Sequence, residues 1–236
     1  MKRSYAIGWR AFTLVELMVI VAVMCVLAAL FLPQWIRRQQ RQYGCCRISC
    51  VNNLKQVGLS FKTWALDNND RFPMQVSVTN GGTMELVSAG NLWPHFLVMS
   101  NELSTPKTLF CPEESDKQRT VANMFLPYTP APGTFRDPPV PLTNDNHLSY
   151  FVGVDADDNY PQMVLAGDHN LAIGAKPAGH GLYSVWTNTP ITWLGPMHNG
   201  HGNVLLADGS VQTLTSSNWH RILVQTGVAT NRLAVP

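Results

Sequence analysis

The chain has 236 residues, and 17 lysines and arginines against 15 aspartates and glutamates leave a formal net charge of +2. Three basic residues precede residue 11, and Glu16 is the one acid before Pro33, so the chain beyond Pro33 is formally neutral. This balance argues against nucleic-acid binding, which needs a concentrated basic surface. The residues beyond Pro33 are enough for one globular domain of about 200 residues.

The first predicted element is an apolar helix from Phe12 to Leu32, interrupted by the polar residues Thr13 and Glu16. Roughly 20 apolar residues at 1.5 Å each cross a hydrocarbon core of about 30 Å, so we expect residues 12–33 to be transmembrane. A secretory signal peptide and a plain membrane anchor are the alternatives, although a signal peptide usually has an apolar region of about 7–15 residues. Basic residues at both ends of the run leave its orientation undecided by charge.

Glu16 is an acid inside this apolar run. An ionised group in hydrocarbon costs about 2.5–3.5 kcal/mol, unless it lies shallow enough to reach the headgroups. The segment Ala11-Phe12-Thr13-Leu14-Val15-Glu16 resembles the processing region of a type IV prepilin. The resemblance implies cleavage between Ala11 and Phe12, which removes leader 1–11, and methylation of the new N-terminus. It also implies that Glu16 pairs with the amine of a neighbouring subunit, and that Pro33 lies where pilin helices often kink.

An amphipathic continuation of the helix is predicted for residues 34–66. Its apolar residues recur at helical spacing: Cys50, Leu54, Val57, Phe61, Trp64 and Ala65. The two segments together predict one helix from about 12 to 66, roughly 80 Å long. The segment Cys50-Val51-Asn52-Asn53-Leu54-Lys55-Gln56, with Phe72-Pro73 after it, resembles the segment that follows the span in bacterial pseudopilin-like proteins.

The remaining residues, 67–236, predict a mainly antiparallel sheet and hence an α+β fold. Short strands are expected at 75–79, 84–87, 148–154 and 162–166, and short helices at 93–99 and 218–225. Proline-rich residues 126–146 predict an extended loop. The last hairpin joins 203–207 to 210–214 through Asp208-Gly209, a pair that suits a type I′ turn.

His198 stands ten residues before Asp208-Gly209. This His-x9-Asp-Gly spacing resembles the C-terminal tail of many pseudopilin-like proteins. The resemblance therefore covers both ends of the chain, while residues 85–190 carry no motif that we assign.

Four cysteines follow the apolar run, Cys45, Cys46, Cys50 and Cys111, and an even number in an exported chain suggests disulfides. Cys46 and Cys50 lie one helical turn apart, a poor geometry for bridging each other. Our hypothesis is a Cys50–Cys111 disulfide that pins the helix to the domain. A zinc site built from the four cysteines is the alternative, but their spacing lacks the C-x2-C pattern.

One dense acidic group contains Asp155, Asp157 and Asn159. It is a candidate calcium site, because hard oxygen ligands on a short loop suit Ca²⁺. The group lacks the glycine and the final glutamate of an EF-hand, so a solvated hairpin tip is the competing interpretation. The second metal candidate combines histidines with one acid, residues that otherwise make surface hydrogen bonds: His169, His180, His198, His201 and Asp168.

No catalytic arrangement of residues stands out, so the sequence does not predict an enzyme. The resemblance implies a prepilin or pseudopilin that is cut by prepilin peptidase, N-methylated and polymerised into a type II secretion pseudopilus or type IV pilus-like filament. It further implies other pseudopilin subunits and an inner-membrane secretion platform as partners. The expected location is a single pass through the bacterial inner membrane, with the N-terminus cytoplasmic and the C-terminal domain periplasmic. A membrane-anchored extracytoplasmic ligand-binding module, with tryptophans that stack on a ligand, is the alternative function.

Overall fold

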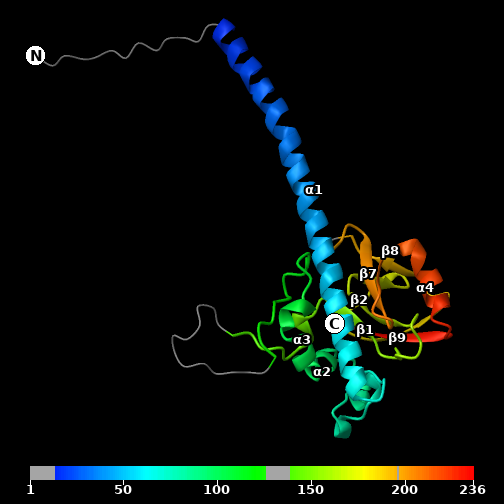
Figure 1. Cartoon of the computed structure of the whole chain (residues 1–236). Helices are drawn as coiled ribbons and strands as arrows, with labels where there is room; N and C mark the ends of the chain where they lie inside the picture. The colour runs from blue at the N-terminus through cyan, green and yellow to red at the C-terminus, as the bar shows by residue number, and fades with distance from the viewer. Residues whose placement is uncertain (1–13, 126–138, 196) are drawn as a thin grey trace, which may run out of the picture. The chain divides into compact units, whose positions relative to one another are not determined.

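The computed structural model describes residues 14–125, 139–195 and 197–236, except for the side chains of residues 31–46. The chain divides into two compact units, residues 1–44 and 45–236, and each is described by itself. Helix α1, Leu14–Asp67, has 54 residues and contributes to both units (Figure 1). It ends within one residue of the predicted end, where Asn69 and Asp70 take left-handed backbone conformations.

The prediction of a transmembrane first half is wrong. In the part of the chain that the structure describes, no helix is both long enough and apolar enough to cross a membrane. The predicted single pass through the inner membrane does not fit this finding for the described residues. Residues 1–11, Phe12 and the side chain of Pro33 lie outside the described residues.

The second unit contains two antiparallel sheets. The larger has six strands in the order β5-β9-β1-β2-β7-β8: β1 Tyr150–Gly153, β2 Val164–Asp168, β5 Gly181–Trp186, β7 His201–Leu206, β8 Val211–Thr215 and β9 Thr230–Val235. The smaller has three strands in the order β4-β3-β6: β3 Leu171–Ile173, β4 Lys176–Pro177 and β6 Ile191–Trp193. The α+β class and the antiparallel sheet agree with the sequence-based expectation.

The second unit also contains short helices outside the sheets. The α-helices are α2 Trp93–Leu97, α3 Ser100–Leu103 and α4 Trp219–Gln225, and the 3-10 helices are η1 Pro73–Gln75, η2 Val78–Asn80, η3 Met84–Ala89, η4 Pro106–Leu109, η5 Asp145–His147 and η6 Ser216–Asn218. The predicted strands at 75–79 and 84–87 are wrong, because Pro73 starts a tight turn there and left-handed Gly81 and Gly90 end two others. The part of the predicted proline-rich loop from 126 to 138 lies outside the described residues.

The six-stranded sheet buries both of its faces. One face packs on the C-terminal part of α1 through a cluster that includes Leu54, Phe61 and Leu205. The opposite face packs on α4 and the small sheet through a cluster that includes Phe151 and Trp219. Neighbouring residues of one strand belong to opposite clusters, as the alternation of side chains in a strand requires.

Gly58 lets α1 approach the sheet closely. A Cβ atom at this position would lie 2.8 Å from a methyl carbon of Leu205 in β7. The predicted hairpin after β7 is present, but its turn is not type I′. The Gly209 N–H donates to the Leu206 carbonyl, so the central residues of the turn are Ala207 and Asp208, and neither has a positive φ. The C-terminal part of α1 and the end of the β7–β8 hairpin are therefore in contact. This contact brings together the segment that begins at Cys50 and the tail motif that ends at Asp208-Gly209, the two motifs that resemble pseudopilin-like proteins.

Candidate functional site

A disulfide joins α1 to the segment after η4. Its cysteines, Cys50 and Cys111, are fully buried, and their Cα atoms lie 5.3 Å apart. This is the pair put forward from the sequence. The bond crosses 61 residues of chain and fixes the start of the buried part of α1 to the globular unit.

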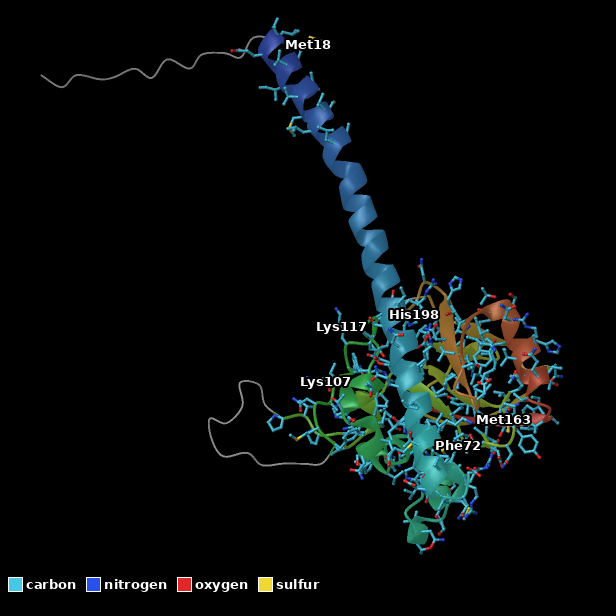
Figure 2. The ribbon with its side chains drawn as sticks, in the orientation of Figure 1. Met18, Phe72, Lys107, Lys117, Met163 and His198 are labelled. Carbon is cyan, nitrogen blue, oxygen red and sulfur yellow. A yellow bond between two sulfur atoms is a disulfide. The ribbon has the colours of Figure 1, made fainter. Side chains whose placement is uncertain are left out.

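His198 lies against this disulfide. Its Nε2 atom is 3.4 Å from the Sγ atom of Cys111, and its side chain is buried. Figure 2 shows His198 beside α1. Three consecutive residues before β7 take positive φ angles: His198 at 51°, Asn199 at 57° and Gly200 at 77°. Such angles are uncommon for residues other than glycine, and this left-handed stretch turns the imidazole into the core.

Two carboxylates flank the imidazole from opposite sides. The Oε2 atom of Glu113 is 2.6 Å from Nδ1 of His198, an ion pair whose atoms are not aligned as a hydrogen bond. The Oδ2 atom of Asp168 is 3.3 Å from Nε2. Burial by itself lowers the pKa of His198, but the hydrogen bond to Asp168 and the charges of Asp168 and Glu113 outweigh it and raise that pKa. The two carboxylates therefore stabilise the protonated imidazole relative to the neutral one.

Asp168 ends β2 and is fully buried. Its Oδ2 atom accepts hydrogen bonds from the backbone N–H of Asn203, at 2.7 Å, and from the side-chain Nδ2 of Asn203, at 2.9 Å. Its Oδ1 atom is buried without a hydrogen-bond partner. Because a buried carboxylate is costly unless it is paired, Asp168 and His198 depend on each other.

A second acid–imidazole pair lies beside the first. The Oε2 atom of Glu114 is 2.8 Å from Nε2 of His169 and accepts a hydrogen bond of 2.7 Å from the Ser149 hydroxyl. Burial raises the pKa of Glu114, but these two partners and the backbone N–H of Asp116 outweigh it and hold the pKa at about 2. Glu114 is therefore ionised at neutral pH although its side chain is nearly inaccessible.

This second pair lines a cavity of about 420 Å³. The wall also includes Asp116, Asn146, Asn170 and His180, and no tryptophan borders it in the described part of the chain. Arg119 reaches it too, but its guanidinium donates to the backbone carbonyls of Asp145, Leu148 and Pro236 and is held in place by them. The cavity offers carboxylate, imidazole and amide groups, which suit a small polar ligand.

Comparisons with protein-family models, with curated proteins and with solved structures found no match for this chain. The function of the site is therefore inferred from its geometry.

The weak calcium candidate is not assembled as a metal site. Asp155 binds the Arg232 side chain and backbone N–H, and Asp157 accepts from Gln75 and Asn159. These oxygens already have protein donors, and the loop presents no open set of ligands. The histidine candidate is divided as well, because His180 pairs with Asp145, 3.0 Å away, and His201 contacts the Asn199 carbonyl.

Among the residues that the structure describes, one group of potential metal ligands has all its ligand atoms within 4.8 Å of one another: Cys50, Cys111 and His198, of which the two cysteines are joined in the disulfide. Of the tail motif, His198 belongs to this site, whereas Asp208 and Gly209 form the turn between β7 and β8, where Asp208 accepts from the Ser210 N–H. Sequence reasoning missed Glu113, Glu114 and the pairing of Asp168 with His198. The available signal was the acidic pair directly after Cys111-Pro112, within reach of any group that approaches the disulfide.

We expect the Glu114 pair to make stability depend on pH. Because the pKa of Glu114 falls from 4.5 to about 2 on folding, its contribution is complete above pH 4.5 and is lost as the pH falls towards 2. The wild-type free energy of unfolding should therefore fall more steeply between pH 5 and pH 2.5 than that of Glu114→Gln, by about 1–3 kcal/mol. Denaturant titrations across this range measure the difference. Asp116→Asn, at the cavity rim, should retain the wild-type slope, and equal slopes for wild type and Glu114→Gln would contradict the assignment.

Proposed function

We propose that this chain is the subunit of a pilus-like filament and that the N-terminal part of α1 is its polymerisation surface. The observation that carries the proposal is the run of exposed apolar side chains from Leu14 to Leu30. Leu14 is 74 % exposed, and most of the large apolar residues after it are about half exposed or more. A continuous apolar surface of this kind marks an interaction site.

The two parts of α1 differ in burial, and this difference supports a filament. Its C-terminal part is buried in the same chain, from Cys50 to Ala65, and is held there by the disulfide. Its N-terminal apolar residues are left for neighbouring copies. Contacts between unlike surfaces of identical subunits generate open helical assemblies, so repeated packing of this segment yields a fibre.

The N-terminal resemblance supplies the processing step of this proposal. Cleavage by a prepilin peptidase between Ala11 and Phe12, followed by N-methylation, produces a chain in which Glu16 is the fifth residue. The carboxylate of Glu16 then neutralises the terminal amine of a neighbour as the apolar segments pack. An ion pair completed on assembly favours the assembled register over a shifted one.

The buried disulfide supports an oxidising location for residues 45–236, because disulfides persist in exported proteins and are rare in the cytosol. We therefore place this unit outside the cytoplasm, in a pseudopilus or a related pilus-like filament built with other pseudopilin subunits.

The cavity beside Glu114 and His169 favours a second function, the binding of a small polar ligand by the exported domain. Stacking of a ligand on tryptophans is not the mode that this cavity offers. Trp193 is buried, with its ring centroid 5.2 Å from that of Trp219. Trp186 is exposed but does not border the cavity.

Two matched substitutions test the filament proposal. Val23 in α1 is 51 % exposed and Val224 in α4 is 53 % exposed, so aspartate at either position should leave the fold of one chain intact. Val23→Asp should reduce the yield of filaments at least tenfold, because a charge enters the apolar contact between copies. Val224→Asp should leave the yield near that of wild type.

Filament yield is measured by shearing cells that express each variant, sedimenting the fibres and examining them by electron microscopy. Equal yields from Val23→Asp and wild type would contradict the assignment of the surface. So would an equal loss in Val23→Asp and Val224→Asp, because it would remove any special role of α1.

A further inference from the structure

Three buried side chains from distant parts of the sequence meet at one point. Cys50 comes from α1, Cys111 from the segment after η4, and His198 from the left-handed stretch before β7. A ligand atom of each, two sulfurs and one imidazole nitrogen, lies within 4.8 Å of the others. The ligand atoms of a tetrahedral zinc ion lie about 3.3–3.8 Å apart. The 3.4 Å between Nε2 of His198 and Sγ of Cys111 fits this spacing, and reduction frees the two bonded sulfurs to move apart.

We propose that, once the disulfide is reduced, Cys50, Cys111 and His198 bind one zinc ion. Thiolate and imidazole are ligands that zinc prefers, and structural zinc sites are buried and tetrahedral. Asp168 contacts the imidazole, with Oδ2 at 3.3 Å from Nε2 of His198, but it does not belong to the group whose ligand atoms lie within 4.8 Å of one another, so the chain supplies three ligands. The Oδ1 atom of Asp168 is buried without a hydrogen-bond partner.

The surroundings of His198 support the same assignment. Metal-binding histidines usually give their second ring N–H to a carboxylate, which fixes the ring and directs the other nitrogen at the ion. Here Glu113 lies 2.6 Å from Nδ1, and Nε2 is directed at Cys111. The ring is therefore oriented in advance for a metal at the position of the sulfurs.

Conversion of the disulfide form into the zinc form conserves atoms and electrons. An external dithiol reductant gives two electrons and is itself oxidised to a disulfide, while the Cys50–Cys111 bond breaks and each sulfur gains one electron and one proton. Zinc then displaces the two thiol protons, and the proton on Nε2 of His198 where it is present, to solvent and binds the two thiolates and the neutral imidazole. In either state the start of the buried part of α1 stays fixed to the segment at Cys111, so this attachment survives reduction.

Cobalt and zinc titrations of the full chain test the proposal. Cys25, Cys45 and Cys46 are first replaced by serine, so that two thiols remain, and the chain is reduced under nitrogen. The reduced chain should bind one equivalent of Co²⁺ with the visible absorption of a tetrahedral site and a sulfur charge-transfer band, and Zn²⁺ should displace it. The oxidised chain should bind neither ion, and zinc should raise the thermal midpoint of the reduced chain alone.

Variants separate this site from loose thiol binding. His198→Ala should weaken zinc binding at least tenfold, measured by competition with a chromogenic chelator, whereas His220→Ala on the exposed surface of α4 should not change it. Glu113→Gln retains every ligand and should weaken binding about 10–100-fold, so it decides the matter if His198→Ala fails to fold. Zinc binding that is equal in the oxidised and reduced chains, or unchanged in both His198→Ala and Glu113→Gln, would overturn the proposal.

Discussion

Replacing Cys111 by serine should lower the free energy of unfolding of the globular unit by about 4 kcal/mol. The disulfide spans 61 residues, and closing a loop of that length restricts the unfolded chain by about this amount in the chain-entropy description. For a unit of this size the thermal midpoint should fall by roughly 8–16 °C. Denaturant and thermal unfolding without reductant measure the change.

Cys25→Ser is the matched control, because Cys25 is exposed in α1 and forms no disulfide. It should leave the unfolding of the globular unit unchanged. Wild type that is reduced in the presence of a metal chelator should approach the midpoint of Cys111→Ser. A loss no larger in Cys111→Ser than in Cys25→Ser would show that the bond does not stabilise the fold.

Replacing Asp168 by alanine should cost about 3–5 kcal/mol, the loss expected when one partner of a buried ion pair is removed. The variant leaves the His198 imidazole beside Glu113 alone and removes the acceptor of the Asn203 backbone and side-chain N–H groups. Because these groups are buried, water cannot replace the lost acceptor at low cost. Chemical denaturation gives the free energy.

Asp208→Ala is the control for this experiment, since it makes the same substitution at an exposed acid that accepts one backbone hydrogen bond in the turn after β7. Its cost should stay near 1 kcal/mol. Similar costs at the two positions would refute the central place of Asp168 in the buried cluster.

Local patterns in the sequence were sufficient for part of the fold. The stripe that contains Leu54 and Phe61 identifies the buried face of α1, because one side of a helix must cover the sheet. The hairpin around Asp208-Gly209 is equally local. The Cys50–Cys111 disulfide was one hypothesis that the sequence left open beside a zinc site, and the structure contains it.

Long-range pairing was beyond the sequence. Strand β9 lies between β5 and β1, but the sequence of residues 230–235 does not predict which strands it pairs with. The burial of Asp168 and its contact with His198 arise only when β2 and the stretch before β7 meet, because β2 and β7 are neighbours in the sheet. Aspartate and histidine are seldom fully buried, so their residue types alone do not predict that Asp168 and His198 lie in the core.

The apolar N-terminal run shows where a pattern was over-interpreted. Length and hydropathy predicted a membrane span, whereas the described helices do not reach that length and apolarity together. The same exposed side chains, Leu14 to Leu30, are equally what a helix needs to pack against copies of itself. That second interpretation leads to the filament.

The N-terminus of the mature protein tests the filament proposal most directly. The chain is expressed with prepilin peptidase, purified from the assembled fraction, and its N-terminal peptide is sequenced by mass spectrometry. The proposal predicts a first residue of Phe12 that carries one additional methyl group on its amine. A mature chain that retains Met1, or one that begins after Ala29, would contradict it.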